Sequence, residues 1–190
     1  MRAEVTPIAG VLHLEAEVVR DDRGWFTRLY DADELAAVGV ATPFVQSSLS
    51  ANAVAGTLRG LHLQRPPHGE AKLVHCAHGR LWDVAVDLRA ESPTFGSWWA
   101  TELVAGRGDA VFLPEGIAHG FVTLDDDTVV HYQISSRYEP SAAIGVRWDD
   151  PDLAIDWPRR PTVMSDRDRQ LPSLRQSGLW ARPEDRGDDA

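Results

Sequence analysis

A histidine and the only lysine of the chain lie ten residues apart and could together move a proton. His62 stands within residues 59–64, and Lys72 is the single lysine among 19 lysines and arginines. An imidazole can accept a proton near neutral pH. Lysine is a compact point charge on a flexible stem, which suits an ammonium that must face one oxygen. The pair suggests acid–base chemistry, and chance loss of the other lysines is the alternative explanation for Lys72 alone.

A base of this kind needs a group that orients it and an acid that delivers the new proton. Tyr132 falls in a predicted strand and could donate a proton from its phenol. Asp166 and Asp168, near the end of the chain, are candidate carboxylates to orient a histidine. The sequence alone does not say which of these side chains meet, and for Tyr132 taken singly a place in the core is the simpler interpretation.

Arginines supply candidates for binding an anion. Arg23, Arg59 and Arg167 each offer a planar fork of donors that can bind a phosphate through two hydrogen bonds, although singly each could be a surface residue. The formal net charge of -10 argues against nucleic-acid binding, which needs a basic surface. A small anionic ligand meets the local arginines rather than the net charge.

One motif is typical of a metal-binding barrel but is incomplete. Residues 114–119 read Pro-x-Gly-x-x-His, which resembles the second motif of the cupin superfamily, where the histidine binds a metal in many members. The first motif usually supplies two histidines two residues apart, and here the second position is Gln64. Glu70 lies at a loose spacing. Because His62 and His119 alone fall short of the three protein ligands usual at a catalytic metal, we expect no metal and no cofactor.

The elements that must position these residues are short β-type segments bounded by Gly, Pro, Asp and Asn, recurring about every eight to twelve residues as in a sandwich or barrel. Predicted strands cover residues 11–19, 57–64, 72–78, 80–88, 98–104, 109–113, 120–124 and 128–135. In the fourth of these, Asp83 shares a face with Leu81, and the alternate face is wholly apolar. Short helices are predicted at 31–38, capped by Asp31, and at 166–171, capped by Ser165.

Composition sets further bounds. With 43% hydrophobic and 25% charged residues, the chain is an ordinary globular protein. We expect one domain over residues 1–178 and a polar tail over 179–190. The single cysteine, Cys76, excludes an internal disulfide framework and favours a reducing cytoplasm. No apolar run approaches the roughly 18 residues of a membrane span.

Seven blocks of sequence match one family in order. They are residues 22–26, 59–64, 83–89, 92–96, 114–121, 148–151 and 165–168. From about residue 18 to 172 the chain resembles the dTDP-4-dehydrorhamnose 3,5-epimerase family. The resemblance implies an all-β, cupin-type double-stranded β-helix, or jelly-roll barrel, with a few short helices at the termini. It also implies a homodimer in which an N-terminal segment reaches into the partner, and no nucleic-acid or membrane partner.

The resemblance further implies metal-free epimerisation of a dTDP-linked 4-keto-6-deoxyhexose, at C3 and C5, without a cofactor. His62 would be the base that removes the proton beside the ketone, and Asp168 would orient it. Lys72 would stabilise the enolate oxygen at C4, and Tyr132 would be the acid on the opposite face. Residues implied to contact phosphate, sugar or nucleotide are Arg23, Phe26, Arg28, Gln46, Ser48, Arg59, His119, Tyr138 and Arg167.

Four ligand-contact positions depart from the family's pattern. Arg28 stands where the family tends to have a glutamate near the nucleotide base, and Ser48 stands where an asparagine follows Gln46 by two. Ala143 aligns with a glutamate, and Arg167 with a lysine. Because the four proton-transfer residues are kept, we expect intact proton chemistry with an altered substrate or substrate range.

Three alternatives remain open. The nearest is an epimerase of C3 alone with the same residues. Another is a metal-dependent cupin oxygenase or isomerase that uses His62, Glu70 and His119. The last is a non-catalytic binder of sugar nucleotides, against which the retention of all four proton-transfer residues argues.

Overall fold

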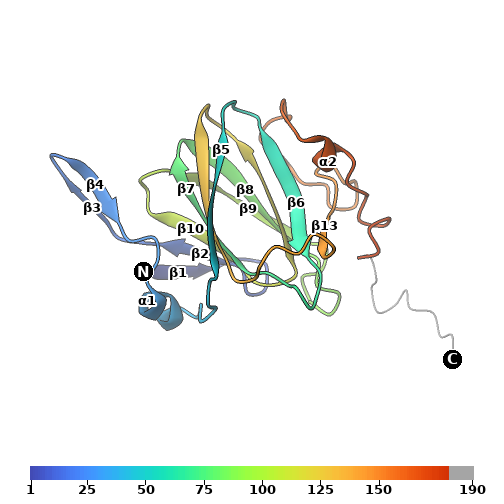
Figure 1. Ribbon diagram of the computed structural model, residues 1–190, viewed down its shortest axis with the longest axis horizontal. Coiled ribbons are helices and arrows are strands. Elements are labelled where there is room, and N and C mark those ends of the chain that lie inside the picture. The colour runs from blue at the N-terminus through green and yellow to red at the C-terminus, as the bar shows by residue number, and fades with distance from the viewer. Residues whose placement is uncertain (180–190) are drawn as a thin grey trace.

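The computed structural model describes residues 1–179, which fold into two facing β-sheets (Figure 1). One sheet has six strands in the order β1 (Arg2–Val5), β2 (Leu12–Glu15), β10 (Asp109–Leu113), β7 (Lys72–His78), β12 (Thr128–Ile134) and β5 (Gln46–Asn52). The other has five, in the order β13 (Ala143–Gly145), β6 (Leu58–Gln64), β11 (Ile117–Thr123), β8 (Arg80–Asp87) and β9 (Trp98–Val104). All these neighbours pair antiparallel, which confirms the predicted all-β jelly-roll barrel.

Three small elements lie outside the two sheets. The hairpin of β3 (Val18–Asp21) and β4 (Gly24–Thr27) projects away from the barrel at the left of Figure 1. The helix α1 (Ala32–Ala37) is capped by the side chain of Asp31, and α2 (Asp166–Arg169) by that of Ser165, as predicted. Neither helix has the length or the apolar character needed to span a membrane.

Alternation along β8 places its side chains in two different cores. Leu81 and Ala85 join the cluster between the two sheets, whereas Val84 and Val86 join a second cluster on the outer face of the five-stranded sheet. The carboxylate of Asp83 is on the side of Leu81, with a residue exposure of 1%. A charged group on this inward face must be paired, because an isolated buried charge is costly.

The predicted bounds agree best at three strands. The observed β7, β9 and β10 have the bounds predicted for residues 72–78, 98–104 and 109–113. The predicted strand at 11–19 was wrong as one element: it divides into β2 and β3, because Ala16 turns aside to bond the Gly108 carbonyl at 2.8 Å. The predicted tail lies, apart from Leu179, outside the described residues, and the single domain stays a prediction.

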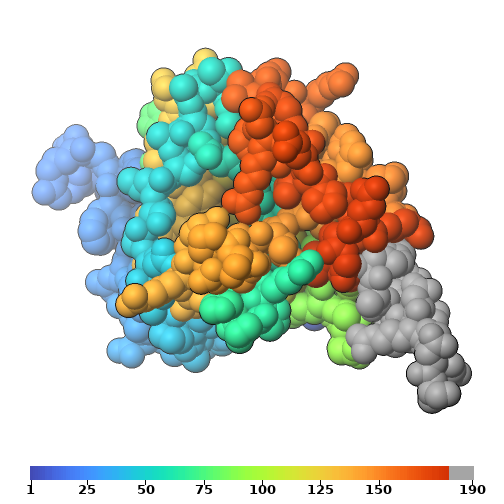
Figure 2. Space-filling model, turned by 45° about the vertical axis from the view of Figure 1, so that its right-hand side comes forward, coloured from blue at the N-terminus to red at the C-terminus, as the bar shows by residue number. Residues whose placement is uncertain are grey.

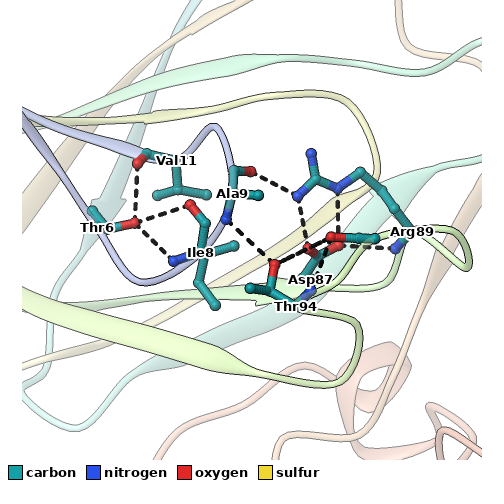
Figure 3. Close-up of polar contacts among 8 residues, drawn as sticks. Thr6, Ile8, Ala9, Val11, Asp87, Arg89 and Thr94 are labelled. Atoms are coloured by element: carbon teal, nitrogen blue, oxygen red, sulfur yellow. Dashed lines mark hydrogen bonds and ion pairs between the residues drawn. The ribbon is translucent and has the colours of Figure 1, made fainter.

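A buried carboxylate ties the loop after β8 to the N-terminal loop (Figure 3). Asp87 is fully buried and accepts hydrogen bonds from the Arg89 side chain and from the Thr94 hydroxyl at 2.6 Å. Thr94 accepts from the backbone N–H of Ala9, and Arg89 donates to the Ala9 carbonyl at 2.7 Å. The network fixes two loops that are distant in the sequence.

Candidate active site

A cavity of about 410 Å³ lies between the two sheets and the segment that contains α2. Figure 2 shows the hollow bounded by the cyan β5 and β6 region, the orange segment after β12 and the red-orange segment near the end of the described chain. Its polar side chains come from both sheets, from α2 and from the adjoining loops. They are Ser50, Arg59, His62, Gln64, Glu70, Lys72, His119, Tyr132, Tyr138, Ser165, Arg167 and Asp168.

His62 is paired with Asp168 across the cavity wall. Nε2 of the imidazole lies 2.6 Å from Oδ1 of the carboxylate. Burial raises the pKa of the Asp168 carboxyl, but the hydrogen bond and the charge of His62, together with Ser165 and the Gly60 backbone, outweigh burial and hold that pKa below its usual range. The other candidate, Asp166, has a side chain that is 92% exposed. Asp168 alone of the two is therefore placed to orient the imidazole.

Lys72 is buried in the same cavity and has two acceptors. Its Nζ lies 2.9 Å from Oε1 of Glu70 and donates to the backbone carbonyl of His62 at 3.3 Å. The side chains of Lys72 and Glu70 are only 9% and 11% exposed. The sequence interpretation considered Glu70 as a metal ligand, and its contact with Lys72 was not foreseen.

Tyr132 presents its phenol from β12, in the opposite sheet to His62. Burial raises the pKa of the phenol, and the nearby carboxylate of Asp83 raises it further, with only a partial offset from Arg59. The ring meets that of His119 edge to face, with centroids 6.0 Å apart. The hydroxyl therefore keeps its proton at neutral pH and is available as an acid.

His119 forms a second imidazole–carboxylate pair in the cavity. Its Nε2 lies 2.7 Å from Oδ2 of Asp83, and both side chains are buried. The pair forms because β11 and β8 are neighbours in the five-stranded sheet. Sequence reasoning did not assign Asp83 to the site, although a carboxylate on the face of Leu81 was the signal available.

The rim of the cavity carries two of the predicted arginines. Arg59 donates from Nε to Oδ1 of Asn52 at 2.8 Å, and Arg167 donates to the hydroxyl of Tyr138 at 3.4 Å. Tyr138 is 58% exposed. Cationic side chains beside an aromatic ring suit an anionic ligand that carries a ring.

Three predicted contact residues do not reach the cavity of their own chain. Arg23 and Phe26 belong to the projecting hairpin, where Arg23 pairs with Asp21 and Phe26 is 66% exposed (Figure 1). Arg28 follows the hairpin and pairs with Asp31. Within one chain, none of these three side chains lines the cavity.

The two predicted contacts on β5 also lie outside the cavity lining. Gln46 donates to the Ser136 carbonyl, and Ser48 is the register partner of Tyr132. From this strand it is Ser50 that lines the cavity, and the sequence interpretation did not foresee it.

The position of the missing histidine is occupied by a fully bonded amide. Nε2 of Gln64 donates to the carbonyls of His68 at 3.0 Å and Arg137 at 3.2 Å, and its oxygen accepts from the N–H of Glu139 at 2.6 Å. Gln64 therefore fixes two loops at the edge of the cavity, with both of its amide hydrogens bonded to backbone carbonyls.

The alternative metal set of His62, Glu70 and His119 is not assembled. Within residues 1–179, only one group of three has ligand atoms that all lie within 4.8 Å of one another. It is Glu4, His13 and Glu15, on β1 and β2. Each residue of the alternative set instead faces its own ionic partner in the cavity.

Comparison with known proteins assigns the chain to one enzyme family. The family whose sequence profile matches the chain, over residues 5–176, is described as dTDP-4-dehydrorhamnose 3,5-epimerase. This chain belongs to the dTDP-4-dehydrorhamnose 3,5-epimerase family. A dTDP-4-dehydrorhamnose 3,5-epimerase of Sinorhizobium fredii is 40% identical over 168 residues, which are 88% of this chain and 86% of the relative.

The dTDP-4-dehydrorhamnose 3,5-epimerase family has relatives named for two different activities. A dTDP-4-dehydrorhamnose 3-epimerase of Streptomyces niveus is 40% identical over 183 residues, covering 94% of this chain and 88% of the relative. A crystal structure of the 3,5-epimerase of Bacillus anthracis, with TDP and PPi bound, has a TM-score of 0.88 at 41% identity. The match covers 91% of this chain and 99% of that one, so the cupin-type fold is shared throughout.

Proposed function

We propose that this chain epimerises C3 and C5 of dTDP-4-keto-6-deoxy-D-glucose, giving dTDP-4-keto-L-rhamnose. One observation supports the proposal most directly: a carboxylate-bound imidazole, a buried ammonium and a protonated phenol open onto one cavity, from His62, Lys72 and Tyr132. Membership of the family supplies the class of substrate.

In the proposed reaction His62 removes the proton from the carbon beside the ketone, and the electron pair of that C–H bond forms the enolate. Asp168, 2.6 Å away, orients the imidazole and stabilises the imidazolium that results. Lys72 faces the negative charge that develops on the C4 oxygen. Preorganised charge of this kind is usually the largest contribution to the rate.

Inversion requires that the new proton arrive from the other face of the sugar. His62 extends from β6 in the five-stranded sheet and Tyr132 from β12 in the six-stranded sheet, so they approach the cavity from opposite sides. Tyr132 donates its proton to the carbon as the enolate collapses and regains a proton from solvent, and His62 releases its proton to solvent. Enolisation toward the other neighbour of C4 repeats the sequence at the second carbon.

The nucleotide end of the substrate supplies binding energy that positions the sugar. Arg59 and Arg167 contact the diphosphate in this proposal, and Tyr138 stacks beside the sugar or the base. His119, held by Asp83 through Nε2, contacts the substrate from within the cavity in this proposal. These assignments rest on the position of each side chain at the cavity.

We further propose a homodimer in which the hairpin β3–β4 of each subunit covers the cavity of its partner. The hairpin leaves its own barrel, and its aromatic residues Trp25 and Phe26 are 49% and 66% exposed (Figure 1). Light scattering should give the mass of a dimer, and Phe26→Ala should raise KM more than it lowers kcat. A fully active monomer would contradict the arrangement.

A cytoplasmic location is also proposed. It is supported by the single cysteine, which favours a reducing compartment. Cell fractionation followed by immunoblotting tests it, and recovery of the protein with secreted or envelope fractions would refute it.

Epimerisation at C3 alone is the second candidate. The 3-epimerase of Streptomyces niveus is as similar to this chain as the 3,5-epimerase of Sinorhizobium fredii, each at 40% identity. Of the departures noted in the sequence, Ala143 lines the cavity, whereas Arg28 and Ser48 lie outside its lining within one chain. A change at Ala143 leaves the proton-transfer residues in place and bears on which carbons are inverted.

The experiment for the proposed function is product analysis by proton NMR after incubation with dTDP-4-keto-6-deoxy-D-glucose. We expect a product with both centres inverted, made by the wild-type chain and lost in His62→Ala. A product inverted only at C3 would assign the second candidate. Unchanged substrate with the wild-type chain would reject both.

A further inference from the structure

We propose that Glu70 is a positioning residue that aims the ammonium of Lys72 at the substrate. The inference rests on the proposed function, because it concerns the same enolate. Glu70 takes no part in the proton transfers described above, yet it lies in the cavity with its side chain only 11% exposed. Its Oε1 is 2.9 Å from Nζ of Lys72.

The contacts of Lys72 leave one donor free for the substrate. A lysine ammonium carries three N–H donors. One faces Oε1 of Glu70 at 2.9 Å, and a second donates to the carbonyl of His62 at 3.3 Å. The ion pair with Glu70 and the hydrogen bond to His62 limit the orientations of the ammonium. An N–H that neither contact uses is left to meet the oxygen at C4 of the bound sugar.

Burial makes this second anchor necessary. The four-carbon stem of lysine is flexible, and ordering it costs rotamer entropy. A buried ammonium that has lost its carboxylate is also poorly compensated, and it turns toward water or other acceptors. With Lys72 at 9% exposure, Glu70 both retains the cation in the cavity and limits its orientations.

The loop that carries Glu70 is itself fixed, as a positioning role requires. Gln64 donates to the His68 carbonyl at 3.0 Å and thereby holds the loop before Glu70. On the other side, the N–H of Ala71 donates to Oγ of Ser135 at 2.8 Å, and the N–H of Ser135 donates to the carbonyl of Ala71 at 3.0 Å. A supporting shell of this kind keeps a site group within the narrow geometry that catalysis needs.

The negative charge of Glu70 and its oxygen acceptor should affect catalysis in opposite ways, and one pair of variants separates the two effects. A carboxylate beside Lys72 weakens the attraction between the ammonium and the enolate, while its oxygen orients the ammonium. Glu70→Gln keeps an oxygen acceptor of the same length and removes the charge. Glu70→Ala removes both. A positioning role therefore predicts that the glutamine variant retains activity and the alanine variant does not.

The test compares wild type, Glu70→Gln, Glu70→Ala and the matched control Glu115→Ala. Glu115 lies beside Gly69, is exposed and is not part of the cavity lining. We expect Glu70→Ala to lower kcat by about tenfold or more, as for the loss of a well-aimed oxyanion donor, with Glu70→Gln and Glu115→Ala within about threefold of wild type. KM for the sugar nucleotide and the Kd for dTDP alone should change by less than about threefold in all variants.

Two results would overturn the inference while leaving the proposed function intact. In the first, the wild type is active and Glu70→Ala has the same kcat. In the second, Glu70→Gln and Glu70→Ala lose kcat by the same factor. Thermal unfolding of each variant shows whether a lower kcat results from partial unfolding. If Glu70→Ala is unstable, the kcat of Glu70→Gln, which keeps the oxygen acceptor, tests the inference instead. An inactive wild type would instead count against the proposed function.

Discussion

Nε2 of His62 lies 2.6 Å from Oδ1 of Asp168, although 106 residues separate them in the chain. The contact exists because α2 packs beside β6 and because Ser165 caps that helix, so that Asp168 in the first turn faces the strand. The carboxylate is buried, and its pKa is still held below the usual range by His62 and by backbone and hydroxyl donors. An ionised carboxylate thus orients an imidazole at the wall of a cavity.

Removing the charge of this carboxylate should slow the reaction without unfolding the chain. Asp168→Asn leaves the shape of the side chain but lets it donate to the imidazole, which disfavours the tautomer needed for proton removal. We expect kcat to fall by about 100-fold, within the range typical of general acid–base groups. Asp166→Asn is the matched control, because Asp166 is two residues from Asp168 and its side chain faces solvent. This substitution should leave kcat unchanged. Equal effects of the two substitutions would contradict the role of Asp168.

Lys72→Arg tests whether position or charge alone is needed at the enolate oxygen. The guanidinium keeps the positive charge but is broader than the ammonium and displaces it from the contacts with Glu70 and His62. Turnover should fall by about 100-fold, with only a small change in the melting temperature. Near-normal turnover would remove the case for a catalytic lysine.

Tyr132→Phe should separate proton removal from inversion. The base at His62 is untouched in this variant, so the enolate still forms, but the acid on the opposite face is gone. In heavy water we expect deuterium to enter the recovered substrate, returned by His62 to the face it left, while little inverted product appears. NMR distinguishes the two species. Inverted product at the wild-type rate would show that another group or a water molecule supplies the proton.

Asp87 should make stability dependent on acid pH. Burial raises the pKa of its carboxyl, but hydrogen bonds from Arg89, Ser92 and Thr94 outweigh burial and lower that pKa in the folded chain (Figure 3). The unfolded chain therefore binds the proton more readily. The stabilisation is complete above the unfolded pKa of about 3.9 and is lost as the pH falls through the lower, folded pKa.

Thermal unfolding at several pH values checks this. Asp87→Asn should cost about 2 kcal/mol at pH 7, and the difference from wild type should shrink below about pH 4. Asp21→Asn, which removes an exposed pair with Arg23, should change the melting temperature little. A difference for Asp87→Asn that stays constant with pH would show that the charge of Asp87 is not the cause.

Sequence reasoning succeeded where a segment's own pattern decides its structure. The strands β7, β9 and β10 have strong β-type patterns between turn residues, and their bounds were predicted correctly even though β9 lies at a sheet edge. The strands β1, β5 and β13 lie at sheet edges and were missed. Their pairing is decided by the neighbouring strand rather than by their own largely polar or short sequences.

The same limit explains which site contacts were foreseen. The motif around His62, the single Lys72 and the helix cap at Ser165 are local signals. The pairs His119–Asp83 and Lys72–Glu70 depend on which strands are neighbours and how side chains turn, which no local pattern contains. The hairpin residues depend on a second subunit in the proposed dimer, so one chain could not bring them to the site.

Hydrogen exchange in heavy water tests the central claim most directly. The wild-type chain and His62→Ala are incubated with dTDP-4-keto-6-deoxy-D-glucose, and deuterium at C3 and C5 is followed by NMR. We expect deuterium at both carbons with the wild type and at neither carbon with His62→Ala. Absence of label with the wild type, or full label with His62→Ala, would contradict proton abstraction by this histidine.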